Sequence, residues 1–197
     1  MTQLSLEQIH QAILQDPANQ AFQEKGWQPV YQAGAGAKLA IIGQAPGIKA
    51  QEAQIPWQDA SGKRLREWLN LSEAVFYNPD QVALIPMDFY YPGKGKTGDL
   101  PPRKDFASKW HPQLFQAMPD LQLTILVGNY ANKAYLKDRY HKNLTQTVQH
   151  YQDYLPQYFP LVHPSPLNGR WLKQHPWFQE QVVPVLQERV ADCLKLH

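Results

Sequence analysis

The sequence predicts an α/β protein, a three-layer α/β/α sandwich around a central, mainly parallel sheet of four strands. Two observations support this class. Four short apolar runs have the length and composition of buried strands, and segments with helical spacing of apolar residues separate them. Because parallel strands are joined by crossover helices that cover the sheet, this alternation is typical of a sheet buried on both faces.

Each element follows from a local pattern. The apolar spacing of residues 4–14 predicts an N-terminal helix, and residues 61–70 predict a second one with Ser61 as its N-cap. The first strand begins near Lys38. The four expected strands are KLAIIG, QVALIPM, LQLTILVG and the YFPLV part of YFPLVHPSP. Further helices are expected at about 107–117, 129–138 and 174–192.

Composition limits the protein class. A chain of 197 residues that is 43% hydrophobic can bury one core, so we expect a single domain over residues 1–197 with a helical extension over 1–30. Its net charge of only +2 means that any attraction to nucleic acid must come from local clusters of charge. The single cysteine, Cys193, excludes an intrachain disulfide and a four-cysteine cluster.

The expected setting follows from the same composition. One cysteine fits a reducing, cytoplasmic compartment. The first residues lack a basic region followed by an apolar core, and no apolar run of 18 residues occurs, so we expect neither export nor a membrane partner. We expect a monomer.

Ligands of parallel sheets lie outside the carboxyl ends of the strands. Four loops occupy these positions: 43–60, 86–105, 128–130 and 163–173. The second is long and basic, and its segment GKGKTG imitates the end of a P-loop. The required first glycine, five positions before Gly95, is Tyr90, so a flexible cationic loop is favoured over a nucleotide site.

Two of these loops carry distinctive turns. GQAPG, residues 43–47, places Gln44 directly after the first strand. HPSPLNGR, residues 163–170, places His163 after the last strand, and Pro164 and Pro166 restrict its backbone. Taken alone, a His-Pro at this position is equally well explained as a structural turn.

Together the two turns resemble the paired active-site motifs of the uracil-DNA glycosylase superfamily. IPWQDASGKRLREWL resembles that superfamily's aromatic segment leading into a helix, and residues 111–136 resemble its following helix, strand and helix. The resemblance covers about residues 38–180. It implies a uracil-DNA glycosylase-like fold and a monofunctional DNA glycosylase. Such an enzyme hydrolyses the N-glycosidic bond of a flipped, deaminated base, here most simply uracil, with hypoxanthine and xanthine as alternatives.

The resemblance also implies residue roles. Gln44 positions water and His163 supports the leaving anion, while Gly43, Ala45 and Trp57 surround the base. A core tryptophan is the alternative for Trp57. The expected DNA contacts are Lys94, Lys96, Arg103, Lys104, Ser165, Leu167, Asn168 and Arg170, with Lys63 and Arg64 beside them. Among these, Leu167 and Arg170 form the wedge that enters the duplex.

Three departures from the superfamily pattern affect the chemistry. Many relatives carry an acid in the first turn, where this chain has Gln44 and Ala45. Several read the base edge with an Asn after the second strand. Here the nearest polar residue is Asp88, which we expect to contact the base, with capping of a loop as the alternative. The iron–sulfur relatives use four cysteines, so we expect no metal and no cofactor, with packing around Trp110, His111 and Pro112 in place of the cluster. Because the acid is absent, a weak or inactive damaged-DNA-binding module is the alternative function.

Overall fold

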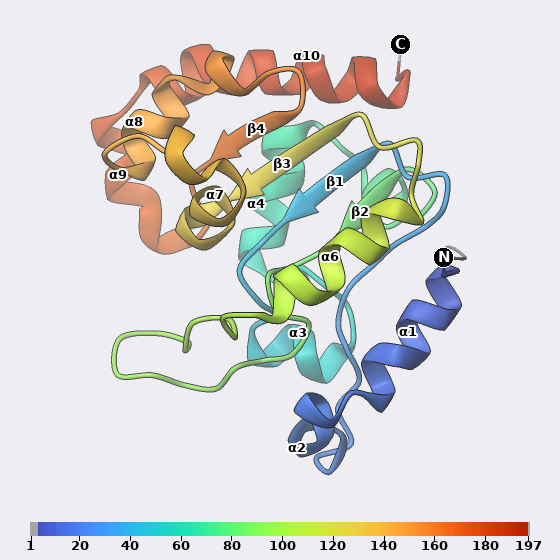
Figure 1. Cartoon of the computed structure of the whole chain (residues 1–197). Coiled ribbons are helices and arrows are strands. Elements are labelled where there is room, and N and C mark those ends of the chain that lie inside the picture. The colour runs from blue at the N-terminus through green and yellow to red at the C-terminus, as the bar shows by residue number, and fades with distance from the viewer. Residues whose placement is uncertain (1–3, 197) are drawn as a thin grey trace.

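The computed structural model describes residues 4–196 and contains a four-stranded sheet in which every pairing is parallel. The strands are β1 (Leu39–Ile42), β2 (Val82–Leu84), β3 (Leu123–Val127) and β4 (Tyr158–Leu161), in the order β2-β1-β3-β4. Helices cover both faces of this sheet (Figure 1). The expected fold class is therefore confirmed, and each strand lies within the segment predicted for it.

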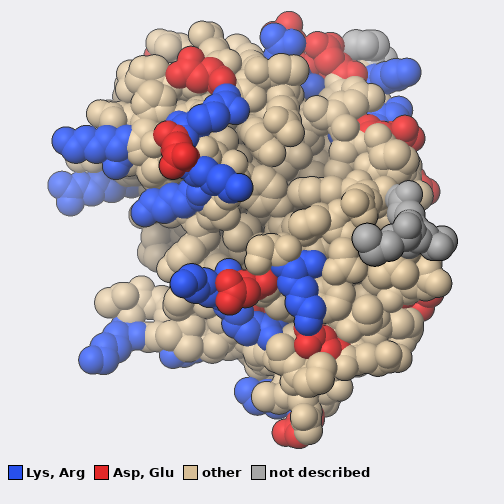
Figure 2. All heavy atoms as spheres, in the orientation of Figure 1, with Lys and Arg blue, Asp and Glu red and all other residues tan. Residues whose placement is uncertain are grey.

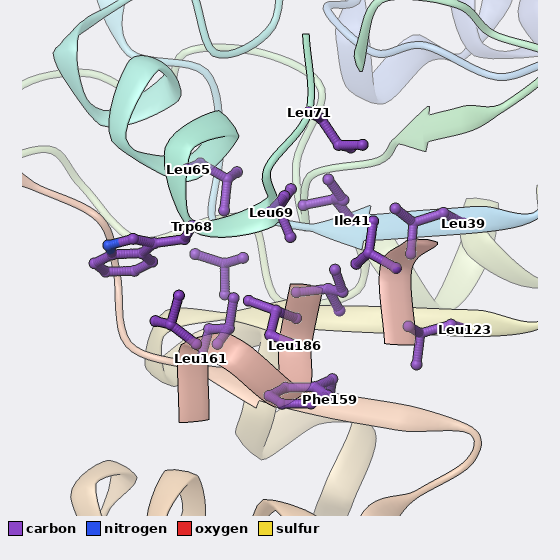
Figure 3. Close-up of a cluster of buried hydrophobic side chains, with 14 of the residues drawn as sticks. Leu39, Ile41, Leu65, Trp68, Leu69, Leu71, Leu123, Phe159, Leu161 and Leu186 are labelled. Carbon is purple, nitrogen blue, oxygen red and sulfur yellow. The ribbon is translucent and has the colours of Figure 1, made fainter. Parts of the chain in front are cut away.

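Side chains of β1 alternate between two apolar cores. Leu39 and Ile41 pack with α4 (Ala60–Leu69) and α10 (Val183–Leu194), as Figure 3 shows around Leu65 and Leu186. The intervening β1 residues, 40 and 42, pack on the other face with α1 (Leu6–Gln15) and α6 (Phe106–Gln116). Burial of both faces explains why the strands are apolar throughout.

The remaining helical segments connect these layers. The short α-helices are α2 (Gln20–Gln23), α3 (Ile48–Ala53), α5 (Glu73–Phe76), α7 (Gly128–Leu136), α8 (Leu144–Gln149) and α9 (Gly169–Gln174). The 3₁₀ turns are η1 (Pro17–Asn19), η2 (Lys137–Arg139), η3 (Tyr151–Tyr154) and η4 (Pro166–Asn168), and η5 (Phe178–Val182) is a π-helical turn. Among residues 4–196, no helix combines the length and apolar content that crossing a bilayer requires.

Two helix boundaries differ from the prediction. The helix expected over 174–192 is interrupted twice. α9 ends at Gln174 because His175 precedes Pro176 and leaves the helical conformation, and η5 precedes α10, where Pro184 has no N–H for an α-helical bond to Glu180. Ser61 is not an N-cap but lies buried inside α4. The cap is Asp59, whose backbone is extended and whose Oδ1 accepts the Gly62 N–H at 2.9 Å. Asp and Ser are equally good N-caps, so residue type alone does not decide between Asp59 and Ser61. The path of the preceding loop decides it.

The N-terminal extension is fastened to the sheet domain. Ile9 and Ile13 of α1 are fully buried in the core that also contains α6. Lys109 of α6 forms an ion pair with Asp16 at 2.6 Å. The extension therefore packs against α6, the helix that follows the loop after β2.

Candidate active site

A cavity of about 470 Å³ lies at the carboxyl end of the sheet. Each of the four loops identified from the sequence contributes to its lining: Gln44 follows β1, Pro86 follows β2, Tyr130 follows β3 and His163 follows β4. Figure 2 shows the molecule notched on the side to which the strands of Figure 1 point. The cavity thus occupies the position where parallel sheets bind ligands.

Backbone hydrogen bonds fix the turn 43–47. The N–H of Met87 donates to the carbonyl of Gly43 at 2.8 Å, and the N–H of Asp88 donates to the carbonyl of Gln44 at 3.2 Å. These bonds extend the β1–β2 pairing beyond the strands. The half-buried Gln44 side chain lines the cavity, and among residues 4–196 its amide has no hydrogen-bond partner. Its oxygen is consequently available to a water molecule or a ligand.

Trp57 forms a wall of the cavity in a strained conformation. Its φ of 59° lies in the left-handed region, which bulky residues seldom adopt. The Tyr77 hydroxyl lies 3.2 and 3.3 Å from the carbonyl oxygens of Pro56 and Trp57 and donates there. Two glycines make room for this arrangement. A Cβ at Gly62 would lie 1.8 Å from the Trp57 carbonyl oxygen, and one at Gly43 would lie 2.8 Å from the indole Cζ2.

The His163 and Trp57 rings lie next to each other in the cavity lining. The two ring centroids are 5.7 Å apart with the planes tilted by 32°. Burial lowers the pKa of His163, while the negative charge of Asp59 raises it and offsets part of this effect. The ring is therefore neutral at pH 7, and among residues 4–196 it makes no hydrogen bond. A neutral imidazole in this position can donate one N–H into the cavity.

The segment 165–170, which we call the finger, projects beside His163. The Asn168 amide donates to the His163 carbonyl at 2.7 Å, and the Ser165 hydroxyl accepts the Leu167 N–H at 3.2 Å. The Leu167 side chain is 92% exposed, and Arg170 is also exposed. Ser165 and Leu167 line the cavity, whereas Asn168 and Arg170 do not. The finger thus has a fixed base and an apolar tip in solvent.

Asp88 and Arg103 occupy other positions than those predicted. Asp88 is fully buried and does not line the cavity, so it is not placed to read a base edge. Both of its oxygens accept hydrogen bonds from the Arg103 guanidinium, at 2.7 and 2.8 Å. The same guanidinium donates to Asn19 Oδ1 at 2.8 Å and lies over the Phe106 ring. Arg103 therefore joins the loop to the N-terminal extension, and it is not a free phosphate ligand.

The other predicted cations divide into two groups. Arg64 donates to the Ser165 carbonyl at 2.9 Å, so it supports the finger. Lys96, Lys104 and Lys63 are exposed, while Lys94 lies 3.7 Å from Asp99. Lys94 and Lys96 belong to the loop that projects from the body in Figure 1, and Figure 2 shows blue side chains on both sides of the notch.

A histidine supports the loop after β2. His111 is buried in α6, and its Nε2 donates to the Pro86 carbonyl at 2.9 Å, because that oxygen can only accept. Its Nδ1 accepts from the Tyr135 hydroxyl. Burial lowers the pKa of His111 to about 4, which keeps the ring neutral. Among the described residues, no group of three or more His, Cys, Asp or Glu is arranged to hold a metal ion.

Several cavity residues were not identified from the sequence. Asp59, Asp99 and Tyr130 line the cavity, and Gly62 is required by the Trp57 backbone. The first three lie within the predicted loops, but single residues of these types carry no motif. Only the folded loops bring them together.

A second, larger cavity lies elsewhere. It measures about 720 Å³ and lies between α1 and residues 54–58, where His10 Nδ1 hydrogen-bonds the Tyr31 hydroxyl at 2.9 Å. None of the site residues predicted from the sequence lines it. The predicted residues that line the smaller cavity are Gly43, Gln44, Ala45, Trp57, His163, Ser165 and Leu167.

A known protein family matches the chain. A family model described as the uracil DNA glycosylase superfamily matches residues 30–187, which is most of the chain. The match includes the turn 43–47, the Trp57 segment, the loop before α6 and the finger. The chain belongs to the uracil DNA glycosylase superfamily, whose members act on DNA as glycosylases.

Proposed function

We propose that this protein hydrolyses the N-glycosidic bond of a deaminated base in DNA, with uracil as the leading substrate, and leaves an abasic site. The carrying observation is that the neutral His163 ring, the unpaired Gln44 amide and the Trp57 indole border one cavity. A volume of about 470 Å³ lies within the range of small-molecule sites and suits one flipped nucleotide.

The base-binding step depends on Trp57 and His163. The indole offers a flat apolar surface for the flipped base. The His163 N–H donates to a base carbonyl oxygen. When the C1′–N bond breaks, its electron pair passes to the base, and negative charge grows on that oxygen. A neutral donor in a partly dry site stabilises this charge more in the transition state than in the ground state, which is what accelerates the reaction.

The water-addition step depends on Gln44. Its amide oxygen accepts a hydrogen bond from a water whose oxygen forms the new bond to C1′. The sugar resembles an oxocarbenium ion at this stage. No lysine is among the described residues that line the cavity, so Schiff-base chemistry with strand cleavage has no nucleophile there. We therefore propose a monofunctional glycosylase.

DNA is held by the finger and the lysines. The exposed Leu167 tip is suited to fill the space that the flipped base leaves, and Arg170 lies on the same finger. Lys96 and Lys104 are exposed and have no carboxylate partner among residues 4–196, so they are available to phosphates.

The test uses end-labelled oligonucleotides containing uracil, hypoxanthine or xanthine, single-stranded and opposite each normal base, with alkali to reveal abasic sites. We expect cleavage by the wild type. We also expect the single-turnover rate of His163→Ala to be at least about 100-fold lower. Loss of a general acid or of an oxyanion donor typically slows a reaction by about this factor. His150→Ala is the matched control, because His150 is exposed and lies outside the cavity.

The second candidate function is a damaged-DNA-binding module. Gln44 and Ala45 favour this function, because an amide and a methyl group cannot take a proton from water as a carboxylate does. A module of this kind retains modified DNA in a gel-shift assay and releases no base. Release of any of the three bases by the wild type, and its loss in His163→Ala, excludes it.

A further inference from the structure

The cavity contains carboxylates that do not come from the turn 43–47. Among its described lining residues the acids are Asp59 and Asp99. Asp59 precedes α4, and Asp99 belongs to the loop between β2 and α6. Because the turn 43–47 carries no acid, the roles of these two carboxylates are considered separately.

Asp99 lies against the turn that lacks an acid. A Cβ built on Gly47 would lie 4.0 Å from Asp99 Oδ2, which is the nearest described atom outside residues 46–48. The Tyr91 hydroxyl donates to Asp99 Oδ1 at 3.4 Å, and Lys94 Nζ lies 3.7 Å from the same oxygen. These two contacts leave Oδ2 directed at the turn that carries Gln44.

The loop backbone holds Asp99 in this position. Lys94 and Asp99 pair across an antiparallel bridge, and the Leu100 N–H donates to the Gly93 carbonyl at 2.9 Å. Gly93 and Gly98 have φ values of 108° and 147°, which allow the chain to reverse within this short hairpin, residues 93–100. Asp99 is thus part of a hydrogen-bonded turn that borders the cavity.

Asp59 has a different environment. Its Oδ1 caps α4 through the Gly62 N–H at 2.9 Å, and its charge is the one that raises the pKa of His163. Its charge therefore acts on the histidine, where the leaving base becomes negative. A carboxylate there opposes the developing charge, whereas a carboxylate beside the sugar stabilises the positive charge at C1′.

We propose that Asp99 is the catalytic carboxylate of this site, supplied by the 93–100 hairpin in place of the acid that the turn 43–47 lacks. This rests on the proposed glycosylase function. As the C1′–N bond breaks, its electrons go to the base. The oxygen of the water held by Gln44 bonds to C1′, and one proton of that water passes to the Asp99 carboxylate. The departing base anion then takes up a proton, so the overall reaction consumes one water and yields the free base and an abasic sugar.

The test compares Asp99→Asn with Asp59→Asn in single-turnover assays on DNA carrying any base that the wild type releases. Both changes remove one charge from the cavity at constant shape, and Asn retains the capping role at position 59. We expect Asp99→Asn to be about 100-fold slower or more, equally for every released base, with no loss of affinity for undamaged DNA. Asp59→Asn is expected to change the rate by less than about tenfold.

A relocated acid provides a second readout. Glu at position 44 puts a carboxylate in the turn itself, so Gln44→Glu in the Asp99→Asn background is expected to recover at least about tenfold of the lost rate. The role of Asp99 is overturned by an Asp99→Asn enzyme within about threefold of wild type, by a loss confined to one base, or by no recovery with Gln44→Glu. A wild type that releases none of the bases refutes the proposed function, and this inference with it.

Discussion

Replacing Arg103 with alanine is expected to destabilise the fold without directly weakening DNA binding. Asp88 is fully buried, and the Arg103 side chain supplies two of its hydrogen bonds. The remaining donors are the backbone N–H groups of Tyr90 and Arg103. Removing the guanidinium leaves a buried negative charge with no positive partner, because among residues 4–196 Asp88 forms no other ion pair.

The expected magnitude follows from that burial. Breaking a buried ion pair by removing one partner costs about 3 to 5 kcal/mol. For a domain of this length, each kcal/mol shifts the melting temperature by about 2 to 4 °C, so Arg103→Ala should lower it by roughly 6 to 20 °C. Arg103 is 30% exposed, which favours the lower half of the range.

Urea denaturation of four proteins measures the coupling energy between Arg103 and Asp88. These are the wild type, Arg103→Ala, Asp88→Asn and the double variant. Because Asp88→Asn removes the buried charge, the double variant is expected to be more stable than Arg103→Ala alone, with a coupling energy of at least about 2 kcal/mol. A parallel gel shift on undamaged DNA, at a temperature where every variant is folded, should show equal affinities.

One result would refute this reasoning. If Arg103→Ala keeps the wild-type denaturation midpoint and binds DNA more weakly, with a smaller dependence on salt, then Arg103 contacts phosphate. The ion pair with Asp88 would then contribute nothing to stability.

Three further predictions concern the cavity and its support. Gly62→Ala should lower the melting temperature and slow base release by about 100-fold, because the added Cβ displaces the Trp57 carbonyl. Calorimetry measures the first effect and a single-turnover assay the second. Because burial lowers the His163 pKa below about 6.5 and the neutral ring is the active form, the rate should be level from about pH 7 to 8 and fall in acid; a pH–rate profile measures this. Burial also lowers the pKa of His111 to about 4, so the unfolded chain binds more protons below about pH 6.5. Stability should therefore fall by roughly 3 kcal/mol between pH 6.5 and 4, measured by urea denaturation.

Matched variants make these predictions specific. Gly169→Ala is the stability control for Gly62→Ala, because no described atom beyond its chain neighbours and its own helix backbone lies within 4 Å of a Cβ at Gly169. An equal loss of stability in both variants contradicts the steric account. His111→Asn removes the titrating ring, and an acid dependence of stability that persists in it assigns that dependence to other groups. A rate that rises as the pH falls from 7 to 6 shows that the protonated form of His163 is active.

The strands and the ligand loops could be predicted because their signals are local. Apolar runs that end at glycine or proline are visible in the sequence, and the parallel arrangement then places their carboxyl ends together. The Asp88–Arg103 pair was not predictable in this way. Its partners are 15 residues apart within an irregular loop, and their contact depends on how that loop folds against the N-terminal extension. The Asp59 cap was missed because Ser61 is an equally good capping residue by type.

The backbone of Trp57 bears on whether this residue belongs to the site or only to the core. A non-glycine residue at φ 59° is strained by about 1 to 3 kcal/mol, and such strain persists only where neighbours impose it. Here Gly62 leaves space for the carbonyl, the Tyr77 hydroxyl holds that carbonyl, and Gly43 leaves space for the ring. An indole that merely filled the core could adopt a relaxed backbone, and it would be buried rather than half-exposed at a cavity wall. The constraints instead fix the ring plane beside His163, and this fixed plane supports the proposed stacking of a flipped base.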